Sequence, residues 1–418
     1  MQEIQLAAEH MEELPESVDN GDYILLQGIA SRICSFPPWL ARQHILTLTD
    51  PGELVLDQFS GKGTALLEAL GQNRVALGVD VAPDAFILSS AKTYPLTYPE
   101  VLETLARIYR LVDHGSSDHV LTGRLGSVTR QASIFYHPRT FRELRCFIEA
   151  CLYLRKRTSG DRLRELRFVQ AILLGLLHGH RNEALSLPCS HAYSMSPAYV
   201  RKKRLEDESR VRRGLKAKYP IAYRNLWECL ESRALQICPS SSTVARIRSL
   251  CGRVWYGSAL TFPKEPEFEG RVTLCLTSPP YLDRQRYAKD NWIRLWALGY
   301  DHRTVNRRMH GFISGSLSKY LDHLELVLLK TSRLLRVGGH LVLIVGDVKT
   351  DLKAKPIVNL GTEIVRRTRQ MSRKYDDFHM VHLGTRRDDV PAGRRSSNSF
   401  WSSQAGTKID RIVCFRRE

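Results

Sequence analysis

The sequence lacks the features that mark membrane-bound and disulfide-rich proteins. Nowhere in its 418 residues does an apolar run approach the roughly 18 residues of a membrane helix. Residues 1–20 are acidic and do not show a basic stretch followed by an apolar one, as a secretory signal would. The 9 cysteines contain no C-x-x-C pair, which argues against a zinc site or a disulfide framework. We therefore expect a soluble, cytoplasmic protein with no metal, whose cysteines are reduced core thiols.

Acidic residues are scarce relative to basic ones. The chain has 44 Asp and Glu against 62 Lys and Arg, a formal net charge of +18 and a pI near 9.6. This excess favours a polyanionic partner such as nucleic acid, because Lys and Arg that neutralise phosphates release condensed counterions. For any single basic cluster, however, a solvated surface is about as common as a binding site.

A Ser-Pro-Pro-Tyr turn at residues 278–281 follows the apolar run at 272–276, which predicts a buried strand. Two prolines end the strand, so its last carbonyls and the Ser278 hydroxyl have no strand partner. Such acceptors beside the Tyr281 ring suit a planar, amino-bearing ring. Taken alone, the motif is equally typical of an ordinary core turn.

A glycine loop lies more than two hundred residues upstream. The strand predicted at residues 54–57 is followed by Gln58-Phe59-Ser60-Gly61-Lys62-Gly63-Thr64 and a helical pattern. Glycines allow a ligand to approach the backbone, and the helix N-terminus offers free N–H groups to an anionic group. A second strand, at 75–80, ends in Asp80, about 20 positions on, where an acid can bind ribose hydroxyls. The loop is neither a Walker A motif nor a full dinucleotide fingerprint, so an adenosyl cofactor without a triphosphate fits better than ATP or NAD.

Together these motifs resemble those of the amino-group DNA methyltransferases. Residues 57–64 resemble the D-P-F-x-G-x-G-T motif that binds S-adenosylmethionine, and residues 277–281 resemble the catalytic motif in the S-P-P-Y form closest to cytosine-N4 enzymes. Further ordered similarity lies at residues 36–40, 287–299 and 334–343, and the last block predicts a helix end, a Gly-Gly turn and a strand. The joint occurrence of these blocks over about residues 30 to 350 is far more specific than any one of them.

The resemblance implies an α/β fold of the Rossmann-like class I methyltransferase type, with a mostly parallel twisted sheet and helices on both faces. It implies S-adenosylmethionine as the cofactor, held by Phe36, Pro37, Asp57, Phe59, Gly61, Gly63, Thr64, Asp80 and Ser258. It also assigns the catalytic motif to Ser278, Pro279, Pro280 and Tyr281. Two residues depart from the family pattern: Gln58 replaces a proline, which we expect to loosen the loop, and Ser258 stands where an acid often binds the adenine amino group.

The implied chemistry needs alignment and no covalent nucleophile. Acceptors from Ser278 and the Pro279 carbonyl would bind the two protons of an exocyclic amine and free its lone pair for in-line attack on the sulfonium methyl. The target base would be flipped out of the duplex and stacked on Tyr281. Cytosine-C5 methylation would instead need a cysteine after a proline. The one such pair, Pro188-Cys189, lies in a Ser/Pro-rich segment, and we interpret it as a chance match.

A long, mostly helical segment separates Asp80 from the strand predicted at residues 253–256. Helical patterns at 99–113, 138–157 and 161–178 favour an insertion over residues 96–250, which we interpret as a target-recognition region. Its basic run, Arg201, Lys202, Lys203 and Arg204, is our candidate for nucleic-acid contact, at about even odds against a solvated helix face. The catalytic domain would then comprise residues 20–95 and 251–418, ending in an antiparallel pair of strands at 379–383 and 409–415.

The sequence therefore predicts a site-specific DNA methyltransferase that acts on cytosine N4, as in restriction-modification or phage defence, with DNA and a cognate restriction endonuclease or defence protein as partners. Adenine N6 is the nearest alternative. An RNA or protein-glutamine methyltransferase, or a non-catalytic DNA-binding protein of the same fold, also stays open.

Overall fold

One mixed sheet forms the centre of the protein. The computed structural model describes residues 21–32, 35–113, 123–179, 184–188, 194–262, 266–280, 287–309, 317–349, 357–389 and 406–418. The sheet has 8 strands, seven of them in the order β3-β2-β1-β4-β5-β8-β7, with β6 (Ile357–Val358) pairing β5 off this path. The strands are β1 (Leu54–Asp57), β2 (Val75–Asp80), β3 (Arg253–Tyr256), β4 (Val272–Thr277), β5 (Leu335–Lys349), β7 (Met380–Asp389) and β8 (Gly406–Arg417).

The strand directions confirm the predicted Rossmann-like class I methyltransferase architecture. β3, β2, β1, β4 and β5 are parallel neighbours, whereas β8 runs antiparallel between β5 and β7. From β1 the chain proceeds outward to β2 and β3, and then crosses back to place β4 on the other side of β1. The carboxyl ends of β1 and β4 therefore flank the topological switch point, where open α/β sheets bind their ligands.

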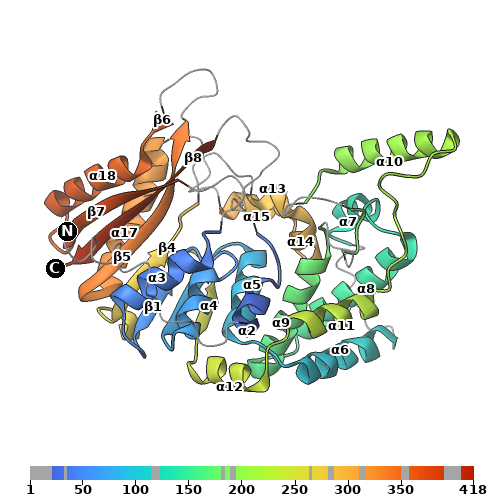
Figure 1. Cartoon of the computed structure of the whole chain (residues 1–418), viewed down its shortest axis with the longest axis horizontal. Coiled ribbons are helices and arrows are strands. Elements are labelled where there is room, and N and C mark those ends of the chain that lie inside the picture. The colour runs from blue at the N-terminus through green and yellow to red at the C-terminus, as the bar shows by residue number, and fades with distance from the viewer. Residues whose placement is uncertain are drawn as a thin grey trace.

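The two faces of the sheet pack into separate cores, because side chains alternate along each strand. Val55, Leu274 and Ile344 enter a larger core that contains α3 (Pro38–Leu48), α4 (Thr64–Gly71) and α5 (Pro83–Thr93). Leu56 and Cys275 enter a smaller core with α17 (Leu317–Leu334) and α18 (Leu360–Lys374). Figure 1 shows α17 and α18 beside β5 and β7 at one end of the molecule.

The segment between β2 and β3 contains helices and no strand among its described residues. After α5 come α6 (Tyr98–Asp113), α7 (Gly126–Ser133), α8 (Pro138–Arg155), α9 (Gly160–Leu176), α10 (Pro197–Arg212), α11 (Leu226–Ile237) and α12 (Ser241–Ser249). Most of them gather at the end of the molecule opposite β7, and α10 projects away from the body (Figure 1). The short helices are α2 (Gly21–Gln27), α13 (Tyr287–Asp290), α14 (Trp292–Ala297) and α15 (His302–Arg308).

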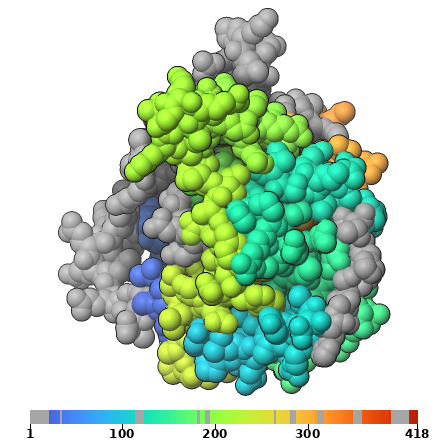
Figure 2. Space-filling model, turned by 90° about the vertical axis from the view of Figure 1, so that its right-hand side faces the viewer, coloured from blue at the N-terminus to red at the C-terminus, as the bar shows by residue number. Residues whose placement is uncertain are grey.

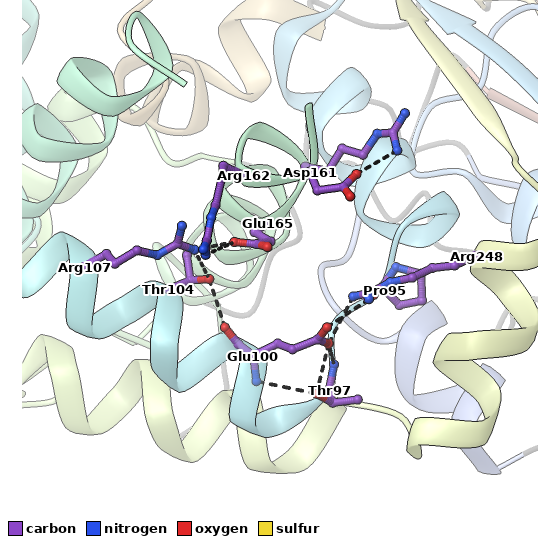
Figure 3. A network of polar contacts seen from close by, with 10 residues as sticks. Pro95, Thr97, Glu100, Thr104, Arg107, Asp161, Arg162, Glu165 and Arg248 are labelled. Carbon is purple, nitrogen blue, oxygen red and sulfur yellow. Dashed lines mark hydrogen bonds and ion pairs between the residues drawn. The ribbon is translucent and has the colours of Figure 1, made fainter. Parts of the chain in front are cut away.

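A polar network fastens these helices to one another (Figure 3). The Glu100 carboxylate of α6 accepts two hydrogen bonds from the Arg248 guanidinium of α12, at 2.9 and 3.0 Å. Arg248 also donates to the Pro95 carbonyl just before α6, and Arg107 on α6 forms an ion pair with Glu165 on α9. The bidentate arrangement fixes the angle between α6 and α12 as well as their distance. It connects the inserted helices to the element that leads directly into β3.

Several predicted boundaries agree with the structure, whereas β7 and β8 extend beyond the predicted residues 379–383 and 409–415, and the Gly-Gly segment differs in conformation. β2 and β3 have the predicted ends, α6 and α8 lie within two residues of theirs at most, and the antiparallel closing pair is confirmed as β7 and β8. The expected Gly-Gly turn is instead part of β5, where the register against β4 shifts between Val272 and Leu274 and Gly338 has a φ of 77°. The paired strand simply bulges around a left-handed glycine, a conformation that costs glycine little.

Within the described residues, no helix is long and apolar enough to cross a membrane.

Gly63 allows α4 and α5 to approach closely, which makes it a test of this packing. Its φ is 75°, and a Cβ there would lie only 2.9 Å from the Ser89 Cα of α5. Gly52 has a similar φ of 85° but nothing within 4 Å of its Cβ position. Gly52→Ala should therefore cost about 1 kcal/mol of unfolding free energy from backbone strain alone, and Gly63→Ala about 1–3 kcal/mol more from overpacking. Urea denaturation of both variants measures the difference; equal losses would contradict the close approach.

Candidate active site

A cleft at the switch point brings together both sequence motifs. Nine of the predicted residues line it: Phe36, Asp57, Phe59, Gly61, Thr64, Asp80, Ser258, Ser278 and Pro280. Pro37, Gly63 and Pro279 are not among its lining residues, and Tyr281 lies outside the described residues. Pro37 instead precedes the first turn of α3, and Gly63 precedes α4 in a left-handed conformation. The two motifs therefore share one cavity although they lie far apart in the sequence.

A buried hydrogen bond joins the two motif strands. The Thr277 hydroxyl at the end of β4 donates to Asp57 Oδ1 at the end of β1, over 2.7 Å and 220 residues of sequence. The Phe59 amide then lies 3.1 Å from both Asp57 Oδ1 and Thr277 Oγ1. Both side chains are buried, so water cannot compete for these bonds. The start of the glycine loop is thus held directly against the Ser278 turn.

The Asp57 carboxyl is kept in an unfavourable setting for a charge. Burial raises its pKa to about 7, the hydrogen bonds from Thr277 and Phe59 lower it in part, and the nearby Asp80 charge raises it further. Burial is the largest of these effects because a desolvated carboxylate loses its hydration. Near neutral pH the group therefore changes its protonation, and a cation placed beside it would favour the ionised form.

Asp80 shapes the glycine loop. Its Oδ2 accepts the Gly61 N–H at 2.8 Å, and its Oδ1 accepts the Ala82 N–H at 2.8 Å. Burial raises its pKa, and the opposing influences include the Arg32 charge and these two backbone donors. Each carboxylate oxygen can accept a second hydrogen bond. The predicted ribose role thus requires Asp80 to bind a ligand and the loop at the same time.

The Ser278 hydroxyl already donates its hydrogen bond within the protein. Its hydroxyl donates to the Ile344 carbonyl of β5 at 2.9 Å. With its only proton committed to this bond, the oxygen can act towards a ligand only as an acceptor. This oxygen would therefore bind a ligand group that donates N–H hydrogen bonds.

Gln58 does not loosen the loop as its sequence position suggests. Its amide oxygen accepts the Thr331 hydroxyl of α17 at 2.6 Å and the Cys275 thiol of β4 at 3.6 Å. A proline could make neither contact, so the substitution anchors the loop to the smaller core. This corrects the expectation from the family pattern.

Three polar atoms along the cleft have no hydrogen-bond partner among the described residues. They are Gln58 Nε2, Ser60 Oγ and Thr64 Oγ1, and all three are buried. A buried polar group without a partner costs roughly 1–3 kcal/mol, which a polar ligand can recover. The cleft therefore suits a ligand with several donors and acceptors. Ser258, by contrast, already accepts a hydrogen bond from the Leu260 amide, at 3.2 Å.

The sequence did not single out several lining residues with polar or charged side chains, among them Arg32, Lys62, Tyr287 and His323. Lys62 stands inside the recognised loop, and burial lowers its pKa. Tyr287 belongs to a block that resembles the family, so both could have been found. No pattern singles out Arg32 or His323.

Among the described residues there is also no cluster of acidic, His or Cys side chains suited to a metal ion.

The basic run at residues 201–204 lies on α10, which is not part of the cleft. Arg201, Lys202 and Arg204 are exposed. Lys203 instead forms an ion pair with Glu206 at 2.9 Å, and its ammonium lies 4.9 Å from the centre of the Tyr219 ring. Lys203 is therefore a structural contact of the helix more than a free cation.

Titration of Asp57 should be visible in the stability of the protein. Because its folded-state pKa of about 7 lies above its ordinary value of 3.8, the folded protein retains a proton that the unfolded chain has released. The free energy of unfolding of the wild type should then fall as the pH rises from about 4 to about 7, relative to that of Asp57→Asn. The Asn oxygen still accepts from Thr277. Urea denaturation over this pH series measures the difference, and a constant offset between the two proteins would disprove the shift.

Comparison with known proteins bears on the part of the chain that carries the glycine loop. Residues 23–89 match the family model N6_N4_Mtase, described as DNA methylase. This region contains Phe36, the glycine loop and Asp80. Among proteins of curated function there is no match.

Similar solved structures include methyltransferases with different substrates. A proposed DNA modification methylase from Thermus thermophilus is 21% identical over 38% of this chain and 48% of its own, with a TM-score of 0.22. The same protein in complex with S-adenosyl-L-methionine is 23% identical over 38% and 49%, with a TM-score of 0.22. The rRNA methyltransferase AviRa from Streptomyces viridochromogenes is 9% identical over 97% and 95%, with a TM-score of 0.33.

The match to the Thermus protein covers only about half of that protein's length. The family match, by contrast, falls on the segment whose loop and acid line the cleft. Together with the order of the strands, it supports a methyltransferase that uses S-adenosylmethionine.

Proposed function

We propose that this protein transfers a methyl group from S-adenosylmethionine to the exocyclic N4 amine of cytosine in DNA. One observation carries the proposal: the Asp57–Thr277 hydrogen bond holds the glycine loop and the Ser278 turn in a single cleft. A donor bound at the first and an amine bound at the second would meet within that cleft. Such an enzyme would work in the cytoplasm, beside a cognate restriction endonuclease or another defence protein.

The cleft residues fit the cofactor at several points. Gly61, Thr64 and the start of α4 would bind its amino-acid part, Asp80 its ribose, and Phe36 and Phe59 would give apolar walls. When bound, the cofactor supplies an activated sulfonium methyl. The unpartnered Ser60 and Thr64 hydroxyls would gain hydrogen-bond partners from it.

The Ser278 turn would hold the amine. An amine conjugated with a ring is a poor nucleophile, because its lone pair is delocalised. The Ser278 oxygen, whose proton is committed to Ile344, and the Pro279 carbonyl would accept its two N–H bonds and favour a pyramidal nitrogen. Tyr281 would stack on the flipped base. The protein's contribution is then alignment for in-line displacement.

The Cys275 thiol, which lies on the motif strand, does not offer a nucleophile for attack on the ring. Cys275, on the strand that ends in the motif, is buried, and burial raises the pKa of its thiol well above its ordinary value. A thiol that stays protonated is a poor nucleophile. Cys189, which a C5 mechanism would need, lies outside the described residues.

The decisive experiment identifies the methylated nucleoside. The protein is incubated with labelled cofactor and either DNA or RNA, and digested nucleosides are analysed by mass spectrometry. We expect N4-methyl-2′-deoxycytidine from DNA, and we expect Ser278→Ala to lower its rate of formation by roughly 100-fold, as loss of one aligned polar contact does elsewhere. The affinity of the Ser278→Ala variant for the cofactor should stay within a few fold of the wild-type value.

Other products would redirect the assignment. Formation of N6-methyl-2′-deoxyadenosine would assign the target base as adenine, and label in RNA alone would contradict a DNA substrate. Full activity of Ser278→Ala would show that this serine does not hold the amine.

We further propose that one face of α10 contacts the DNA backbone. A groove along this helix is lined by Arg201, Lys202, Arg210, Arg213 and Lys218, with Glu206 as its one carboxylate. The buried Asp207 carboxylate accepts the Lys218 and Tyr219 amides, each at 2.7 Å, and so folds the following segment back along the helix. α10 lies across the top of the face seen in Figure 2. A raised, cationic groove of this kind complements a row of phosphates.

Two double variants with equal charge loss test this surface. Arg201→Ala with Lys202→Ala removes two groove cations, whereas Arg204→Ala with Arg212→Ala removes two exposed cations that do not line the groove. The first should weaken DNA binding and lower the slope of log affinity against log salt by about 2, roughly one per phosphate contact. The second should change the slope by less. Fluorescence anisotropy at several salt concentrations measures both, and equal slopes would exclude a specific role for the groove.

A further inference from the structure

A buried arginine that the family pattern does not single out lies against the glycine loop. Arg32 is 7% exposed and lines the cleft together with Gly61, Lys62 and Asp80. Its Nη1 lies 3.5 Å from the position that a Cβ on Gly61 would occupy. The guanidinium is therefore within contact distance of the first glycine of the loop, where any side chain would meet it.

The orientation of this guanidinium is fixed from its inner side. Nε donates to Asp84 Oδ2 at 3.1 Å, and the Asp84 side chain, in the first turn of α5, is 2% exposed. The guanidinium carbon also lies 5.8 Å from the centre of the Tyr287 ring. A cation held by a buried carboxylate and an aromatic face loses little conformational entropy when it binds a ligand.

The outer side of the guanidinium is available. A guanidinium has five N–H donors, and the described residues accept only the one on Nε. Nη1 and Nη2 carry the other four. Two parallel N–H bonds from these nitrogens match the geometry of a carboxylate.

The charges around Arg32 leave room for an anion. Asp84 and Asp80 both act electrostatically on Arg32, and Arg294, which is 1% exposed, interacts with Asp84 and Arg32. The half-buried Lys62 lines the same cleft. Two carboxylates thus face three cations, so an additional negative charge at the outer side of Arg32 would be stabilised.

We propose that Arg32 binds the carboxylate of the amino-acid part of the cofactor through Nη1 and Nη2. This inference rests on the proposed function. The cofactor carries one anionic group, and the loop that Arg32 contacts leads into the helix N-terminus that, in the proposed function, would bind the same end of the ligand. Arg32 is thereby a binding residue that distinguishes an adenosyl amino acid from a plain adenosine.

Two ligands that differ in this group provide the test. S-adenosylhomocysteine has the amino-acid part, whereas 5′-methylthioadenosine lacks both its carboxylate and its ammonium. Calorimetry should show that Arg32→Gln binds S-adenosylhomocysteine roughly 10- to 100-fold more weakly than the wild type, the effect of losing a charge-assisted pair. Its affinity for 5′-methylthioadenosine should stay within about 3-fold. Arg32→Lys, which keeps the charge without the fork, should lose less.

A matched control acts on the part that both ligands share. Asp80→Asn should weaken both ligands by a similar factor, because each contains the ribose. If Arg32→Gln also weakens both equally, or if it weakens only DNA binding, a carboxylate role is wrong, and the second result would assign Arg32 to a phosphate. If the wild type binds neither ligand, the cofactor assignment fails together with the role of Arg32. Selective loss of S-adenosylhomocysteine by a folded variant supports it.

Discussion

The hydrogen bond between Thr277 and Asp57 is the contact on which the site depends. It joins the ends of β1 and β4, the neighbouring strands between which the chain reverses its order across the sheet. Because the bond is buried, it fixes the glycine loop relative to the Ser278 turn to within the tolerance of a short hydrogen bond. A transfer reaction without a covalent intermediate needs that precision, since misalignment by about 1 Å can cost roughly 100-fold in rate.

Packing on either side keeps this contact in place. Gly63 allows α5 to approach the start of α4, so the loop is held from the larger core, and Gln58 ties the same loop to Thr331 in the smaller core. The Ser278 hydroxyl is held by Ile344 of β5. Each motif is therefore anchored to an element outside itself. The helices inserted between β2 and β3 are joined to the approach to β3 through Glu100 and Arg248, at a distance along the chain from both motifs.

The sequence was sufficient for strands β1 to β4 and for nine of the residues that line the cleft. β2 and β3 were predictable because each is a short apolar run bounded by turn residues, and the loop and Ser278 because motif spacing reports backbone geometry. The Gly-Gly bulge in β5 was not, since only the register against β4 decides whether such a pair turns or bulges. The contacts made by Gln58, Arg32 and the groove face of α10 involve residues 11 to 273 positions away in the sequence. Asp207, for example, accepts a hydrogen bond from Lys218, and Gln58 accepts one from Thr331. Local patterns carry no record of those neighbours.

The charges of the cleft explain why its residues are individually unfavourable. Burial raises the pKa of Asp57 and of Asp80, and burial lowers that of Lys62, so each group is strained in its charged form. Such strain is common where a ligand completes the electrostatics. A zwitterionic cofactor offers both signs at once: its cationic groups would stabilise the ionised Asp57, and its carboxylate would neutralise Arg32. Binding would then offset the free-energy cost of desolvating these groups on folding. Substitutions at these residues that stabilise the empty protein should therefore weaken its affinity for the cofactor.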